Sequence, residues 1–185
     1  MVTIFFKKGW HQDTYVGFRK KFNVSDDVEV TNDRLVYWGR KFNHDMSDKI
    51  MITGSRGFIG SALTKYFDNP IEYDIALDRG MSVLNKHALS LFMDKVKPNI
   101  IIHLAGNSLP SKSVEDPVYD MNLNIGGTLN LLEVCKNRKI DLLLFSSTAY
   151  VYGEPQYLPV DENHQQAHPN LPYGISKSSC ESYCN

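Results

Sequence analysis

The chain has 185 residues, of which 42% are hydrophobic and 22% are charged, and its formal net charge is −1. This composition is typical of a globular domain with a hydrophobic core, and the near-zero charge offers no electrostatic attraction for nucleic acid. No apolar run approaches the roughly 18 residues that a membrane span needs. We therefore expect no nucleic-acid partner and no membrane partner. The three cysteines lack zinc-like spacing, so we expect free thiols, no metal site and a cytoplasmic location.

Residues 1–48 differ from the rest of the chain in their hydrophobic pattern. Aromatic residues are scattered through this part without a sustained period, although residues 28–31 and 34–38 have the composition of short strands. We expect an N-terminal extension of unknown fold, with short strands as one option. Apolar runs and helical patterns alternate after it, so we expect a nucleotide-binding unit over residues 49–185.

The elements expected in this second unit alternate between strands and helices. In chain order they are a strand at 49–53, a helix at 58–67, a strand at 71–74 with a longer alternative to 77, and a short strand at 81–84. A helix at 86–96, a strand at 99–104, a helix at 120–137, a strand at 142–145 and a last helix at 173–184 follow. Because parallel strands need crossover helices, this order predicts the α/β class with a Rossmann-type, doubly wound parallel sheet.

A glycine-spaced turn joins the first of these strands to the first helix. Gly54, Gly57 and Gly60 lie at intervals of three residues, with Phe58 and Ile59 between the last two. Gly54 permits a tight turn, Gly57 lets the backbone approach a pyrophosphate, and Gly60 lets the helix pack closely on the strand. The helix N-terminus adds N–H donors and positive potential. In its strand–turn–helix context, this spacing predicts a dinucleotide-binding turn.

A carboxylate at the end of the second strand is expected to bind the ribose hydroxyls of an adenosine. Asp74 ends the shorter form of that strand and Asp78 ends the longer one, so both are candidates. Either acid favours NAD over NADP because it would repel a 2′-phosphate. Arg56 and Arg79 would act in the opposite direction.

A further group of polar residues follows the strand expected at 142–145. Tyr173 and Lys177 are four residues apart, so they lie on one face of the last helix. A lysine ammonium near a phenol lowers the pKa of the phenol, which makes a tyrosine usable as an acid and base near neutral pH. Thr148, at the end of the neighbouring strand, is placed to hydrogen-bond both a substrate oxygen and the phenol. The pattern therefore indicates acid–base chemistry.

Together these motifs resemble the extended short-chain dehydrogenase/reductases, and among them the NAD-dependent epimerase/dehydratase family, most of all its UDP-glucose 4-epimerases. The matching segments are residues 53–60, 102–106, 124–128, 146–153 and 172–177. The phrase formed by Tyr73-Asp74-Ile75 and the later Ser82-Val83 also recurs in these enzymes, which favours Asp74 over Asp78 at the ribose.

The resemblance implies NAD as cofactor, with NADP less favoured, and a UDP-linked nucleotide sugar as substrate. It implies Thr148, Tyr173 and Lys177 as the catalytic set: Tyr173 takes the proton of a sugar hydroxyl while hydride passes to NAD, and Lys177 also holds the nicotinamide ribose. His103 is expected to be a packed strand residue rather than a base. The residues implied at the cofactor are Gly54, Gly57, Phe58, Ile59, Gly60, Asp74, Asp78, Leu104, Ala105, Gly106, Asn124, Ser146, Tyr173 and Lys177.

The chain departs from this family in length. Relatives continue well beyond the position of Lys177 with a lobe that grips the nucleotide sugar, so we expect a C-terminally truncated unit that lacks this substrate lobe. Three functions remain open: an epimerase, a reductase or dehydratase of the same family, and a non-catalytic NAD-binding or interaction fragment. Dehydratases usually carry an acidic pair after the catalytic hydroxyl, whereas Ala149 and Tyr150 follow Thr148 here. Relatives also dimerise through helices that flank the sheet, so a homodimer is an option.

Overall fold

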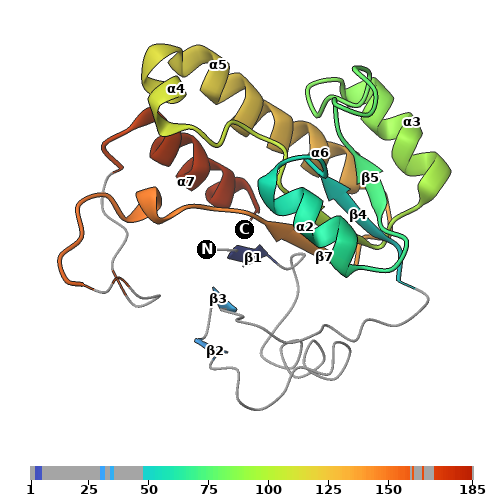
Figure 1. Ribbon diagram of the computed structural model, residues 1–185, viewed down its shortest axis with the longest axis horizontal. Coiled ribbons are helices and arrows are strands. Elements are labelled where there is room, and N and C mark those ends of the chain that lie inside the picture. Colours follow the sequence, from blue (N-terminus) through green and yellow to red (C-terminus); the bar gives the residue numbers. More distant parts are fainter. Residues whose placement is uncertain are drawn as a thin grey trace.

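The structure is a computed structural model that describes residues 3–5, 30–31, 34–35, 48–158, 160, 164 and 169–184. Its centre is a five-stranded sheet with the order β1-β7-β6-β4-β5 (Figure 1). The strands are β1 (Thr3–Phe5), β4 (Ile50–Thr53), β5 (Ile71–Tyr73), β6 (Ile100–His103) and β7 (Leu142–Phe145). The last four are parallel, and β1 pairs antiparallel with β7 at the edge.

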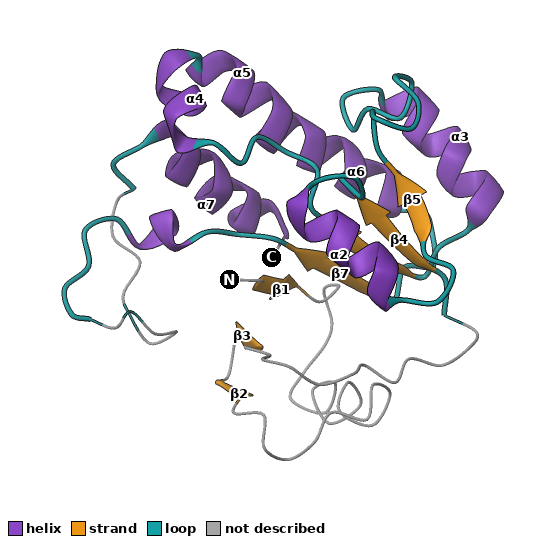
Figure 2. Ribbon diagram, viewed as in Figure 1, coloured by secondary structure: helices purple, strands orange, loops and turns teal. Residues whose placement is uncertain are grey.

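Helices connect the parallel strands and cover both faces of the sheet (Figure 2). They are α2 (Phe58–Tyr66), α3 (Lys86–Val96), α4 (Pro110–Glu115), α5 (Pro117–Met121), the π-helical η1 (Asn122–Gly126), α6 (Gly127–Cys135), the 3₁₀-helical η2 (Ala149–Tyr152) and α7 (Pro172–Cys184). From β4 the chain moves one way to β5 and then back past β4 to β6. Since parallel crossovers are right-handed, this reversal places α2 on one face and α3 and α6 on the other.

The central strands are buried on both faces, which explains their unbroken apolar sequences. Every residue of β4 and β6 is buried. Side chains alternate along these strands, and one set, which includes Met51 and Ile101, forms a core with Leu89 of α3 and Leu131 of α6. The register pairs Thr53 with His103, so the carboxyl ends of β4 and β6 lie side by side.

The predicted α/β fold and parallel sheet are confirmed, and several elements have the expected bounds. The helix predicted at 86–96 and the strand predicted at 142–145 match α3 and β7. The helix predicted at 120–137 begins earlier, at Pro117, and it runs through a π-helical turn into α6. The short helix α4 was not predicted.

Two predictions about the segment after β5 are wrong. The longer form of the second strand fails because β5 ends at Tyr73. Asp74 then turns the chain by accepting a hydrogen bond from the backbone N of Ala76 at 2.8 Å. Residues 81–84 form no strand; they make a turn in which Val83 is buried in the core against α3 and α6. The apolar residues there serve packing rather than strand pairing.

The N-terminal part contains short strands, which was one of the options expected for residues 1–48. β2 (Val30–Thr31) and β3 (Arg34–Leu35) pair antiparallel inside the stretches that have strand-like composition. β1 belongs to the same part of the chain, yet it extends the main sheet beside β7. The division into 1–48 and 49–185 stays a prediction. None of the helices in the described part is long and apolar enough to cross a bilayer.

The core predicts a sharp contrast between two leucines of α3. Leu89 is 0% exposed and Leu91 is 58% exposed. We expect Leu89→Ala to lower the free energy of unfolding by about 2–5 kcal/mol, because it leaves a cavity between the sheet and α6. Leu91→Ala, the control on the same helix, should change it by less than about 0.5 kcal/mol. Urea denaturation followed by circular dichroism measures both, and equal losses would contradict this packing.

Candidate nucleotide-binding and catalytic site

The glycine turn after β4 is required by steric contacts within the fold. Gly54 has a φ of +69°, and a Cβ there would lie 2.8 Å from the backbone N of Ala105. A Cβ on Gly60 would lie 2.1 Å from the carbonyl oxygen of Gly54. The first glycine therefore lets β4 approach the end of β6, and the last lets α2 pack on the turn.

The middle glycine opens the same turn toward solvent. A Cβ on Gly57 would meet only the carbonyl oxygen of Gly54, at 3.3 Å. Gly57 is also the N-cap of α2, and no side chain caps this helix end. The N-terminal backbone N–H groups, which include those of Phe58 and Ile59, are thus left to an outside acceptor, and the helix dipole favours an anion there. Phe58 projects outward with 95% of its surface exposed.

Asp74 lies against the glycine turn, whereas Asp78 does not contact it. The Asp74 carboxylate accepts a hydrogen bond from the backbone N of Arg56 at 2.9 Å. Asp78 instead accepts a hydrogen bond from the backbone N of Gly80 at 2.8 Å, within an exposed loop. A carboxylate has about four acceptor positions, so Asp74 keeps capacity for ribose hydroxyls beside its two backbone donors.

Thr53 and His103 join the ends of β4 and β6. Thr53 Oγ1 lies 2.7 Å from Nδ1 of His103 and accepts hydrogen bonds from the backbone N of Leu104 and of Ala105, both at 3.2 Å. His103 Nε2 lies 3.1 Å from Oγ1 of Thr128. Burial, followed by the charge of Lys177, lowers the pKa of His103 to about 3. His103 is therefore a neutral, packed strand residue, as expected.

A buried amide network supports the segment that follows β6. Asn124, in the π-helical turn η1, accepts a hydrogen bond from the backbone N of Asn107 at 2.8 Å. Its Nδ2 donates to Asp120 Oδ1 and to Ser176 Oγ, both at 3.0 Å. A Cβ on Gly106 would lie 2.5 Å from Asn124 Oδ1. The network thus holds the backbone around Gly106 against η1 and α7.

Asp120 is the acidic residue of this network, and the motifs did not predict it. Its side chain is 1% exposed, and Oδ1 also accepts a hydrogen bond from Nδ2 of Asn107 at 2.7 Å. The only sequence signal was its spacing of four residues before Asn124, which places both side chains on one helical face. Its charge raises the pKa of both Tyr173 and Lys177.

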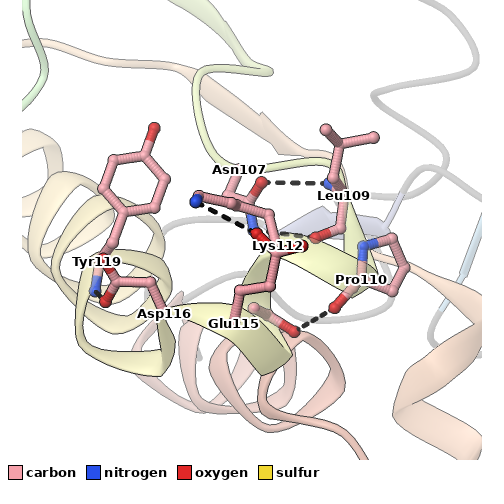
Figure 3. Close-up of polar contacts among 8 residues, drawn as sticks. Asn107, Leu109, Pro110, Lys112, Glu115, Asp116 and Tyr119 are labelled. Atoms are coloured by element: carbon pink, nitrogen blue, oxygen red, sulfur yellow. Dashed lines mark hydrogen bonds and ion pairs between the residues drawn. The ribbon is translucent and has the colours of Figure 1, made fainter.

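Figure 3 shows how Asn107 shapes the entry into α4. Asn107 Oδ1 accepts a hydrogen bond from the backbone N of Leu109, and its Nδ2 donates to the carbonyl oxygen of Leu109, both at 3.1 Å. Ser113 of α4 donates to the carbonyl oxygen of Pro110 at 2.7 Å and accepts from the backbone N of Tyr173 at 3.0 Å. The unpredicted helix α4 therefore positions the start of α7.

The three expected catalytic residues meet at the carboxyl end of β7. Thr148 hydrogen-bonds the Tyr173 side chain, and both side chains are at least partly buried. Lys177, one turn after Tyr173 on α7, is buried, and its Nζ donates to the carbonyl oxygen of Ser146 at 3.0 Å. Lys177 Nζ also lies 4.8 Å from the centre of the Phe145 ring.

The lowering of the Tyr173 pKa that we expect from Lys177 stays a prediction. Burial raises the pKa of Tyr173, the hydrogen bond from Thr148 opposes this rise, and the charges of Asp120 and Tyr150 add to it. The Lys177 ammonium is directed to Ser146 and the Phe145 ring, and burial lowers its own pKa. Removal of the phenolate from water is therefore the largest influence on the pKa of Tyr173.

The glycine contacts predict opposite effects for two substitutions. Gly60→Ala should lower the free energy of unfolding by about 1–3 kcal/mol, because the added methyl group meets the carbonyl oxygen of Gly54. At Gly126 a Cβ would meet only Leu84 Cδ2, at 3.9 Å, in helical backbone. Gly126→Ala should therefore raise the free energy of unfolding by about 0.4–1 kcal/mol. Thermal melts compare the two, and a neutral Gly60→Ala variant would contradict the close packing of α2 on the turn.

In the described part of the chain, no group of three or more His, Cys, Asp or Glu residues is arranged to hold a metal ion.

The chain is 38% identical over 152 residues to a putative UDP-glucose 4-epimerase of Methanocaldococcus jannaschii, an alignment that covers 72% of this chain and 49% of that protein. The chain thus spans about half the length of the curated relatives that it matches.

Two solved structures show the same fold. UDP-glucose 4-epimerase from Brucella ovis in complex with NAD has a TM-score of 0.66 at 30% identity, over 74% of this chain and 46% of that one. RMD from Pseudomonas aeruginosa complexed with NADPH has a TM-score of 0.63 at 30% identity, over 75% and 48%. The model of the NAD dependent epimerase/dehydratase family matches residues 50–185. The chain therefore belongs to the NAD dependent epimerase/dehydratase family.

Proposed function

We propose that this chain is the cofactor-binding and catalytic part of an NAD-dependent nucleotide-sugar epimerase that acts on UDP-linked hexoses. One observation carries the proposal. The Thr148–Tyr173 hydrogen bond and the buried Lys177 lie at the same carboxyl edge of the sheet as the glycine turn. The UDP-glucose 4-epimerases among the relatives support this choice of reaction and substrate. The half of those relatives outside the match would supply the lobe that grips the nucleotide sugar.

The residues at this edge fit a dinucleotide. The uncapped N-terminus of α2 and the open side of Gly57 suit a pyrophosphate, and Asp74 suits the hydroxyls of the adenosine ribose. The backbone of residues 104–106 would line the cofactor, and Asn124 would hold that backbone in place. Ser146, whose carbonyl oxygen holds Lys177, would lie beside the nicotinamide ribose.

The chain's own residues supply the acid–base chemistry of the proposed reaction. Tyr173 would accept the proton of the sugar 4-hydroxyl. It would return the proton after the keto sugar has rotated to present its other face. Thr148 would hydrogen-bond the same hydroxyl and hold the phenol in place. NAD, when bound, supplies the hydride acceptor and a positively charged ring that lowers the pKa of a phenol close to it.

Lys177 would assist Tyr173 through its charge and would bind the nicotinamide ribose. Burial lowers the pKa of Lys177, and the nearby Asp120, Glu181 and cysteine thiols raise it. The two carboxylates therefore help to keep a buried ammonium charged, which the interior would otherwise disfavour.

The second candidate is a nucleotide-sugar reductase of the same family. The likeness to RMD from Pseudomonas aeruginosa, solved with NADPH, favours it. A dehydratase is less well supported, because Ala149 and Tyr150 follow Thr148 in place of an acidic pair. The reductase would consume NADPH, whereas the epimerase returns its hydride and consumes no cofactor.

The cysteines support a proposed cytoplasmic location. Cys180 and Cys184 of α7 carry free thiols. Burial raises the pKa of Cys184 to about 12, and Cys180 Sγ donates a hydrogen bond to the backbone O of Asn124. Such packed thiols suit a reducing compartment.

Turnover of a UDP-sugar tests the proposed reaction. We expect the NAD-loaded chain to convert UDP-galactose to UDP-glucose, as followed by chromatography of the nucleotide sugars. Tyr173→Phe should lower the rate by about 10²–10⁴-fold because it removes the general base. Tyr66→Phe, at a partly exposed position of α2, should leave the rate unchanged. Turnover that is as fast in folded Tyr173→Phe as in the unmodified chain would refute the proposed role of Tyr173, and NADPH consumption would favour the reductase.

We also propose a homodimer through α5 and α7. These helices pack side by side, and both expose large apolar side chains. The exposed apolar residues are Val118 and Met121 of α5 and Ile175 and Tyr183 of α7. Apolar residues gathered on adjacent helices are typical of an interface between copies.

A charge placed in this face should break the dimer. We expect sedimentation velocity to show a dimer for the unmodified chain and a monomer for Val118→Glu, because the interface would then bury an unpaired carboxylate. Leu91→Glu places the same charge at an exposed position of α3, outside this face, and should leave the dimer intact. A monomeric unmodified chain at micromolar concentration would contradict the proposed interface.

A further inference from the structure

The choice between NAD and NADP is not decided by family membership. The solved relatives include several complexes with NAD and one with NADPH. The two cofactors differ by a single phosphate on the adenosine ribose, so the residues around that ribose must discriminate between them. In this chain the relevant segments are the glycine turn and the end of β5, which meet where Asp74 accepts a hydrogen bond from the backbone N of Arg56.

Arg56 is the basic residue of the glycine turn, and its guanidinium forms an ion pair with Glu72. Its Nη2 donates to Glu72 Oε1 at 2.9 Å, and its Nε lies 2.9 Å from Glu72 Oε2. This is the paired, fork-like contact that guanidinium groups also make with phosphates. Glu72 lies on β5, two residues before Asp74. The Glu72 carboxylate therefore holds the Nε and Nη2 edge of the guanidinium, which a 2′-phosphate would otherwise compete for.

We propose that Glu72 is a cofactor-specificity residue, which holds Arg56 in a bidentate ion pair and so withholds its guanidinium from the 2′-phosphate of NADP. The inference rests on the proposed NAD site. Glu72 and Asp74 together present two carboxylates beside the same ribose, while the one adjacent cation is already paired. NADP would then meet repulsion without a compensating bond, whereas the ribose hydroxyls of NAD need only an acceptor.

Stability alone gives a weak reason for this ion pair. The side chains of Arg56 and Glu72 are 48% and 27% exposed, and ion pairs of such exposure contribute little to folding. The second basic candidate, Arg79, is exposed in the loop after Asp78 and makes no ion pair within the described residues. Arg79 is thus the alternative source of phosphate affinity that the experiment must separate from Arg56.

Isothermal titration of the full chain with NAD and with NADP tests the proposal without any need for turnover. The unmodified chain should bind NAD in preference to NADP. Glu72→Gln should strengthen NADP binding by about tenfold or more, because the guanidinium is freed for the phosphate, while NAD binding changes by less than about threefold. Glu115→Gln, which breaks the exposed Lys112–Glu115 pair on α4, is the matched control and should leave both affinities unchanged.

Two further variants show which cation is responsible. Glu72→Gln combined with Arg56→Ala should lose the gain in NADP affinity, whereas Glu72→Gln combined with Arg79→Ala should keep it. Retention of the gain without Arg56, or an unchanged NADP affinity in folded Glu72→Gln, would overturn the inference. Failure of the unmodified chain to bind NAD would instead overturn the proposed function, so the two failures are distinguishable. Thermal melts confirm that each variant is folded.

Discussion

The contact between the ends of β4 and β6 is the constraint on which the rest of the site depends. The chain reverses its direction across the sheet between these two strands, and Gly54 reaches the backbone N of Ala105 at a distance that leaves no room for a side chain. Thr53 then hydrogen-bonds the backbone of both residues that follow β6. Because this contact aligns the strand ends, the glycine turn, the backbone of residues 104–106 and the Thr148 hydroxyl share one edge.

A second set of interactions compensates for polar groups that this packing buries. Lys177 and Asp120 are buried in the same region, and each would be costly alone. Lys177 Nζ donates to Ser146, and Asp120 accepts hydrogen bonds from Asn107 and Asn124. The π-helical turn η1 carries Asn124 and links both halves of the network. The acid–base residues thus depend on hydrogen bonds as much as on their own positions.

The sequence predicted the elements where local signals and packing agree. The bounds of α3 were correct because Asn85 caps its start, Lys97 adopts a left-handed conformation at its end, and Pro98 follows. The glycine spacing was informative because the contacts that require Gly54 and Gly60 are steric and leave no room for a Cβ. The strand predicted at 81–84 failed because an apolar run reports burial, and here Val83 is buried by a turn.

The electrostatics of the site could not be predicted from spacing. The interval between Tyr173 and Lys177 places both side chains on one helical face, but it does not reveal where the ammonium is directed. Asp120 and the Arg56–Glu72 pair depend on contacts between segments that are distant in sequence. Such contacts follow from the topology, which the motifs indicate only in outline.

We propose that the glycine turn forms a working dinucleotide site, and a thermal melt of the full chain with increasing NAD tests this most directly. A ligand that binds only the folded state stabilises it by about 2.7 kcal/mol at a concentration of about 100 times its Kd. We predict a cooperative melt whose midpoint rises steadily with NAD concentration. A cooperative melt that NAD does not shift, even at millimolar concentration, would contradict the claim.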